Sequence, residues 1–212
     1  MSTPTYSSSS AATPTVSRTP ALRWTVADIL IATVLGIAAG LIFWVYNGPG
    51  YAWYEAFNAI TPGLGGLATG PWLFAAVLGA LAIRKPGAAI YCEVVAASVS
   101  AGLGNNWGIA TLYSGIAQGI GAELIILAFL YRRFGLAVAA LAGAGAGLGA
   151  WTLEFFMGNA AKTVQFNVTY LVCNLISGLL IAGVLTFFIT RALVAAGALD
   201  RVRAGRDNTV RV

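Results

Sequence analysis

Residues 24–46 read WTVADILIATVLGIAAGLIFWVY, and this run decides the fold. Asp28 is its single charged residue, and about 20 apolar residues suffice for a helix to cross the hydrocarbon core of a bilayer. Five later runs share this apolar character, at 62–83, 86–104, 108–130, 134–157 and 165–190. None shows the alternation of a barrel strand, and helices satisfy their own backbone hydrogen bonds in lipid. The sequence therefore predicts an all-α integral membrane protein, with a six-transmembrane-helix bundle over residues 23–191.

The composition supports this class and excludes several chemistries. Of 212 residues, 58% are hydrophobic and only 9% are charged, whereas about a quarter of the residues of a soluble domain are charged. The chain has no histidine, so it holds neither a Ser–His–Asp triad nor an HExxH zinc site. We therefore expect no enzyme activity, no metal site and no cofactor. Cys92 and Cys173 fall within the runs and are expected to be packing residues.

The ends of the chain predict its orientation. Residues 1–22 are rich in Ser, Thr and Pro, which predicts a disordered tail, and residues 192–212 are expected to form a basic tail. With six spans both termini lie on one side, and every Lys and Arg except Lys162 falls there. The positive-inside rule places this side in the cytoplasm of a multi-pass cell-membrane protein. Anionic lipid then accounts for the basic excess without a nucleic-acid partner.

Four acidic residues lie within the predicted spans: Asp28, Glu93, Glu123 and Glu154. A carboxylate at the bilayer centre costs about 2.5–3.5 kcal/mol on insertion scales, so each one needs a partner or a function. Asp28 is expected at the membrane interface. Glu93 and Glu123 lie at similar depth on consecutive spans, and either a shared cavity or hydrogen bonds between helices would account for them. Glu154 lies near the outer end of its span, on the same helical face as Trp151.

Two spans carry polar side chains on one helical face. These side chains are Asn167, Tyr170, Asn174 and Ser177 in one span, and Trp107, Thr111, Ser114, Gln118 and Gly121 in or just before the other. Hydrogen bonds between helices would explain any one polar face alone, but these two and the face of Trp151 and Glu154 together favour a ligand cavity. The outer connections YAWYEAFN (51–58) and GNNWG (104–108) add aromatic and amide groups. This chemistry suits a flat, nitrogen-rich ring, and a cationic ring most of all.

Several stretches together resemble one known family. They are WTVADILIATVLGIAAG (24–40), RKPGAAIYCE (84–93), GNNWG (104–108) with the following TLYSGIAQGIGAE (111–123), and YRRFGLAVAALAGAGAG (131–147). The combination is similar to the YkoE-like family, whose members are substrate-binding S components of energy-coupling-factor (ECF) transporters associated with hydroxymethylpyrimidine (HMP) and thiamine. The resemblance covers about residues 23–191.

The resemblance implies a six-helix fold that binds a vitamin near the outer face. It also implies a transmembrane coupling subunit and two ATPase subunits as partners. A loop between the first two spans, at 47–61, would act as a lid carrying Tyr51, Trp53, Tyr54 and Glu55. A stripe of small residues on the first span would dock the coupling subunit through Ala32, Gly36 and Gly40, with glycines where many relatives have alanines.

The ligand-binding residues are assigned by their chemistry and depth. The candidates are Trp151, Glu154, Asn106, Trp107, Tyr170, Asn174 and Glu93, the last at the floor of the cavity. The sequence thus predicts an S component of an ECF-type ABC importer for thiamine or its HMP precursor. A stand-alone carrier of a small cationic or aromatic solute, with Glu93 and Glu123 as its proton site, is one alternative. A non-transporting membrane scaffold is another, and it predicts no saturable ligand binding.

Overall fold

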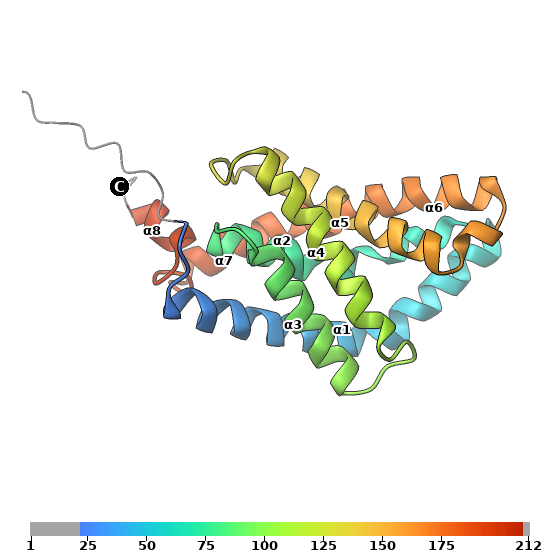
Figure 1. Cartoon of the computed structure of the whole chain (residues 1–212), viewed down its shortest axis with the longest axis horizontal. Helices are drawn as coiled ribbons and strands as arrows, with labels where there is room; N and C mark the ends of the chain where they lie inside the picture. The colour runs from blue at the N-terminus through green and yellow to red at the C-terminus, as the bar shows by residue number, and fades with distance from the viewer. Residues whose placement is uncertain (1–21, 210–212) are drawn as a thin grey trace, which may run out of the picture.

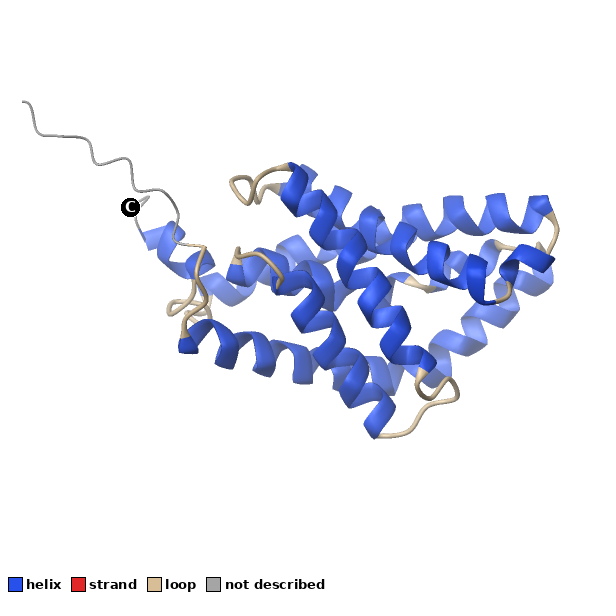
Figure 2. Ribbon diagram, viewed as in Figure 1, coloured by secondary structure: helices blue, strands red, loops and turns tan. Residues whose placement is uncertain are grey.

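The computed structural model describes residues 22–209, and this part of the chain consists of helices and their connections, without strands (Figures 1 and 2). The longer helices are α1 (Val26–Ile60), α2 (Phe74–Ile83), α3 (Ala88–Gly102), α4 (Ala110–Ala128), α5 (Leu136–Met157), α6 (Val164–Ser177), α7 (Thr186–Ala195) and α8 (Arg203–Thr209). The shorter ones are η1 (Leu64–Ala68), η2 (Gly70–Trp72), η3 (Asn159–Ala161) and the π-helical η4 (Gly178–Leu185). The predicted all-α class is confirmed. Of the predicted tail 1–22 only Leu22 is described, and residues 210–212 also lie outside the described part.

Four helical segments among the described residues are long and apolar enough to cross a membrane. They are α1, α4, α5 and the continuous helix Val164–Ala195, which joins α6, η4 and α7. α2 and α3 are shorter, with 10 and 15 residues. The run at 62–83, predicted to be one span, is broken because Gly63 adopts φ +99° and Pro71 opens η2, so two 3-10 turns precede α2.

α1 is longer than the sequence predicts. It begins at a capping box formed by Thr25 and Asp28, passes through Pro49 and ends at Ile60. Proline is tolerated inside membrane helices because neighbouring groups satisfy the freed carbonyl. The expectation of a lid loop at 47–61 is therefore wrong in secondary structure, since these residues are helical almost to their end.

The polar face of α6 holds the irregular backbone of η1 and η2. The Ser177 hydroxyl accepts from the Gly70 amide at 2.9 Å and donates to the Leu67 carbonyl at 2.7 Å. The Thr69 hydroxyl donates to Asn174 Oδ1 at 2.7 Å. Non-helical backbone at membrane depth requires such partners. Asn174 and Ser177 therefore join α6 to the broken segment.

Small residues allow the central helices to approach closely. A Cβ atom at Gly121 of α4 would meet the carbonyl oxygen of Gly145 in α5, and a Cβ atom at Gly143 would meet that of Gly178. Without a hydrophobic driving force in lipid, such backbone contact is a main source of helix association.

The small-residue stripe of α1 is buried inside the chain, so its predicted role as a docking surface is wrong. Ala32 is fully buried, and its carbonyl accepts from the Cys92 thiol at 3.4 Å. A Cβ atom at Gly36 would meet Val95, and one at Gly40 would meet the carbonyl oxygen of Ala96. The stripe fits α3, and a partner subunit has no access to it.

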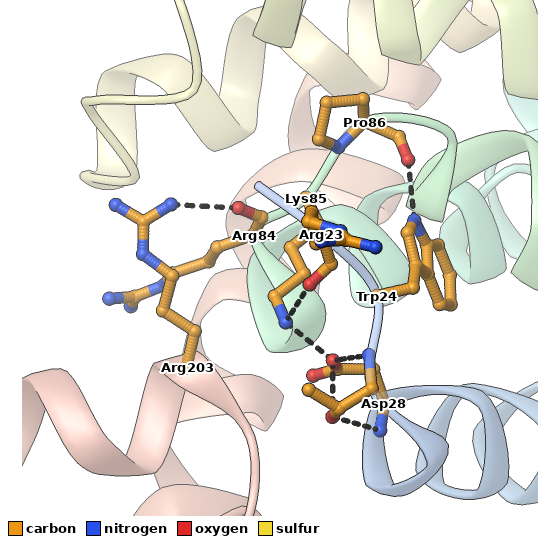
Figure 3. Close-up of polar contacts among 8 residues, drawn as sticks. Arg23, Trp24, Asp28, Arg84, Lys85, Pro86 and Arg203 are labelled. Atoms are coloured by element: carbon orange, nitrogen blue, oxygen red, sulfur yellow. Dashed lines mark hydrogen bonds and ion pairs between the residues drawn. The ribbon is translucent and has the colours of Figure 1, made fainter. Parts of the chain in front are cut away.

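The first turn of α1 and the turn between α2 and α3 form a polar cluster at one end of the molecule (Figure 3). The Lys85 ammonium donates to Asp28 Oδ2 at 2.5 Å and to the Arg23 carbonyl at 2.8 Å, and Trp24 Nε1 donates to the Pro86 carbonyl at 2.8 Å. Asp28 and Lys85 are both buried. Asp28 lies in the first turn of α1, and its partner is Lys85, with which it forms a buried ion pair.

The described part of the predicted basic tail is folded. Leu199, Val202 and Ala204 are buried in one cluster with Ala32 and Cys92. Apolar side chains thus anchor α8 beside the start of α1, at the left in Figure 1.

Arg203 and Asp207 attach α8 to the α2–α3 turn. Arg203 Nη1 donates to the Arg84 carbonyl at 2.9 Å, and Arg84 Nη1 lies 2.8 Å from Asp207 Oδ2. Asp207→Asn should lower the free energy of unfolding by about 0.2–1 kcal/mol, since its side chain is partly exposed. Thermal unfolding in detergent at low and high salt measures this, and the difference should shrink in high salt. Asp200→Asn is the control, and a salt-independent loss would contradict the ion-pair explanation.

Candidate functional site

A cavity of about 370 Å³ lies between α1, η1–η2, α3, α4, α5 and α6, within the usual range for small-molecule sites. Its lining combines aromatic rings with polar and acidic groups. The aromatic and polar lining residues are Phe43, Asn47, Tyr51, Tyr54, Thr69, Trp72, Glu93, Ser100, Trp107, Thr111, Ser114, Gln118, Glu154, Asn159 and Tyr170. None of the lining residues, all within the described chain, is Lys or Arg.

Aromatic rings form a connected wall. Trp107 meets Tyr51 and Trp72 with ring centroids 5.9 Å and 5.7 Å apart, both nearly edge-to-face. Tyr54 meets Tyr170 at 6.1 Å in the same way. Edge-to-face pairs leave ring faces free to stack on a ligand, so the wall suits a planar guest.

Asn47 fixes the indole of Trp72 in this wall. Its Oδ1 accepts from Trp72 Nε1 at 2.9 Å, and its Nδ2 donates to Ser100 Oγ at 3.1 Å. α1, η2 and α3 are thereby joined at the cavity. Because both ends of its amide are hydrogen-bonded, Asn47 is stable within an apolar run.

Glu93 lies at the cavity wall and caps the start of α2. Its side chain is fully buried, and Oε2 accepts from the Ala76 amide at 2.5 Å. Ala76 is the third residue of α2, where a helix has free N–H groups and a partial positive charge. α2 starts inside the molecule, so its first turn needs an internal acceptor.

Gln118 connects Glu93 to the backbone of η2. One end of its amide lies 3.0 Å from both the Trp72 carbonyl oxygen and Glu93 Oε1, and the other lies 2.7 Å from Ser114 Oγ. Two acceptors at one end identify it as the nitrogen. The carbonyl oxygen of Gln118 therefore accepts from Ser114.

Glu123 lies apart from the cavity and caps α3. Its two oxygens accept from the amides of Gly87 and Ala89 at 2.7 and 2.9 Å, and Oε1 also accepts from the Tyr131 hydroxyl at 2.7 Å. Burial, and then the hydrogen bond to Glu123, raise the pKa of Tyr131. The hypothesis that Glu93 and Glu123 share a cavity is wrong, because each caps a different helix.

Glu154 is the second carboxyl group of the cavity and is only partly buried. The Tyr170 hydroxyl and the Lys162 ammonium lie close enough to interact electrostatically with this carboxyl group. Lys162 itself lies outside the cavity lining, with Nζ 4.1 Å from the centre of the Phe166 ring. Glu154 is thus the acidic group with capacity to meet a ligand.

Four of the seven ligand residues proposed from the sequence line the cavity: Glu93, Trp107, Glu154 and Tyr170. The other three lie elsewhere. Trp151 donates to the Asn167 carbonyl at 3.0 Å, Asn106 is exposed, and Asn174 is buried behind the wall. Trp151 and Asn174 share the helical faces of the lining residues, but their side chains bond to neighbouring segments.

The four residues predicted to lie on the lid also differ in position, since two line the cavity and two do not. Tyr51 and Tyr54 line the cavity, whereas Trp53 is 56% exposed and stacks on Phe57. Glu55 is exposed and lies beside Tyr51. Helical geometry gives the reason, since residues three apart share a face and the intervening ones do not.

Sequence reasoning assigned no role to several lining residues, above all Asn47, Thr69 and Trp72. Thr69 and Trp72 belong to the broken segment, whereas the apolar run at 62–83 predicts one continuous span. The signal was the GLGGLATGPW composition at 63–72, since small residues and a proline in an apolar run mark irregular backbone.

Three comparisons relate the chain to known transport proteins. A family model described as "ABC-type cobalt transport system, permease component" matches residues 27–149. The "Putative HMP/thiamine permease protein YkoE" of Bacillus subtilis (strain 168) is 33% identical over an alignment of 189 residues, and the match covers 87% of this chain and 92% of the relative. A solved structure described as "Crystal structure of an S-component of ECF transporter" has a TM-score of 0.81 and 31% identity, and the match covers 89% of this chain and 95% of that chain.

These relatives are transport proteins and not enzymes. With the four helices of membrane-crossing length, they identify a multi-pass membrane protein. The matches span nearly the full length of both relatives, and they show that the chain belongs to the YkoE-like family of ECF-transporter S components.

Proposed function

We propose that the protein is the substrate-binding subunit of an importer for thiamine or HMP. The observation that carries this proposal is an aromatic cavity that contains Glu154 and an amide at Gln118 but no basic lining residue. The name of the Bacillus subtilis relative points to the same two compounds.

The chemistry of thiamine suits each part of this cavity. An aminopyrimidine is flat and stacks on aromatic side chains, while its amino group donates hydrogen bonds. The thiazolium ring is cationic, so aromatic faces and the Glu154 carboxylate both attract it. HMP shares the pyrimidine alone and would use only part of the site.

We further propose six membrane crossings with both termini in the cytoplasm. α2 and α3 would each cross with help from their connections, η1–η2 completing the second crossing. The polar cluster of Figure 3, with Arg84 and Lys85, would then face the cytoplasm in accord with the positive-inside rule. The cavity residues Tyr51 and Trp107 would lie toward the outside.

In this proposal a transmembrane coupling subunit and two ATPase subunits supply the energy. The chain binds the vitamin in an outward state, and a lower affinity in the inward state releases it. Release requires such differential binding between the two states.

Tryptophan fluorescence of the detergent-purified protein provides the test, because Trp72 and Trp107 lie in the wall. Thiamine should quench the signal saturably, and riboflavin should not. Trp107→Phe should reduce the amplitude, whereas Trp53→Phe, outside the cavity, should retain it. Absence of saturable quenching by both thiamine and HMP would refute the assignment and favour a scaffold. Thiamine uptake in cells that lack coupling subunits would instead favour a stand-alone carrier.

A further inference from the structure

We propose that Gln118 selects ligands by the amino group on their pyrimidine ring, with Glu93 as the positioning residue that fixes the Gln118 amide. This inference rests on the proposed function and deepens it, because it names the group on the ligand that the site reads.

The hydrogen bonds of the Gln118 side chain determine what it presents to the cavity. An amide has two N–H donors and an oxygen with two lone pairs. The Trp72 carbonyl and Glu93 Oε1 take the two donors, and Ser114 takes one lone pair. Gln118 lines the cavity and is 7% exposed. What remains for a ligand is an acceptor.

Glu93 prevents the amide from turning over. Its other oxygen is held by the Ala76 amide at 2.5 Å, and the side chain is fully buried. A flipped Gln118 would set its oxygen against the Trp72 carbonyl and against Glu93 Oε1, two acceptors at 3.0 Å. Buried polar groups without partners are costly, so one orientation persists.

An acceptor in this position distinguishes two nearly isosteric ligands. Thiamine presents an amino group at C4 of the pyrimidine, whereas oxythiamine has an oxo group there. The amino group donates to Gln118 Oε1, while the oxo group would face another acceptor. A site with a buried, mismatched polar group loses affinity, and we expect oxythiamine to bind about 10- to 100-fold more weakly than thiamine.

Glu93→Gln should weaken this discrimination. The Ala76 amide requires an oxygen, so the new side-chain nitrogen takes the place of Glu93 Oε1 and donates toward Gln118. Gln118 then meets a mismatch in either orientation, because its N–H groups face this donor in one and its oxygen faces the Trp72 carbonyl in the other. The amide is no longer held in one orientation, and the ratio of the two dissociation constants should fall toward one.

The experiment measures thiamine and oxythiamine affinities of the full-length protein in detergent, by calorimetry, for the wild type and three variants. Glu123→Gln is the matched control, since it also alters a buried helix-capping glutamate but lies outside the cavity, and it should keep the wild-type ratio. Gln118→Met removes the acceptor, and it tests the proposal even if Glu93→Gln fails to fold. The ratio of the two dissociation constants in this variant should also approach one.

Each outcome decides between the two proposals. Equal wild-type affinities for both ligands, or a ratio unchanged in Gln118→Met, would overturn the role of Gln118, and a ratio unchanged in Glu93→Gln would overturn the positioning role of Glu93. Each of these outcomes leaves the proposed function standing. Failure of the wild type to bind both thiamine and HMP would refute the proposed function itself.

Discussion

Glu154→Gln is expected to weaken thiamine binding by roughly 30- to 1000-fold, or about 2–4 kcal/mol. The substitution keeps the shape of the side chain and removes its charge. A cation in a largely buried site loses its charged partner, which typically costs this much. Titration calorimetry of the purified protein measures the change.

Two comparisons isolate the charge in this experiment. HMP lacks the thiazolium cation, so Glu154→Gln should change its affinity far less. Asp200→Asn removes an exposed carboxylate in the turn before α8 and should change neither affinity. An equal loss of thiamine and HMP binding would show that Glu154 shapes the cavity and does not recognise the cation.

Gly121→Val should destabilise the fold by at least about 3 kcal/mol and leave little monodisperse protein after extraction. The new Cβ atom would overlap the carbonyl oxygen of Gly145, and that backbone cannot give way without separating α4 from α5. Overpacking against a fixed backbone falls at the severe end of such substitutions. Thermal unfolding followed by size-exclusion chromatography provides the measurement.

The matched control is Gly102→Val, the same change at the end of α3, where a Cβ atom would meet nothing within 4 Å. It should shift the unfolding midpoint only slightly. If both variants behaved alike, backbone flexibility and not helix contact would explain the loss at Gly121.

The sequence predicts well those features that depend on hydrophobicity alone. Apolar runs locate the helices, and small-residue stripes identify tightly packed faces. The stripe of Ala32, Gly36 and Gly40 does pack closely, but spacing cannot indicate whether the partner is another subunit or α3. That choice depends on which helices become neighbours.

The acidic residues show the same limit at the site. Depth places Glu93 and Glu123 at one level, but only the fold shows that each meets the amino end of a different helix. Likewise, a polar face on α6 predicts hydrogen bonding, but in the structure the residues of this face have two different roles. Tyr170 reaches the cavity, and Asn174 and Ser177 hold the broken segment. Identical spacing serves both purposes, so periodicity alone does not distinguish them.

The continuity of α1 connects the two ends of the molecule. With 35 residues, the helix is roughly 50 Å long at about 1.5 Å per residue. One end carries Asp28 of the polar cluster, and the other carries Tyr51 and Tyr54 of the aromatic wall. Pro49 lies between them and removes one backbone N–H donor just before the tyrosines. The cavity wall and the polar cluster therefore share a single helix whose backbone ladder is interrupted next to the cavity.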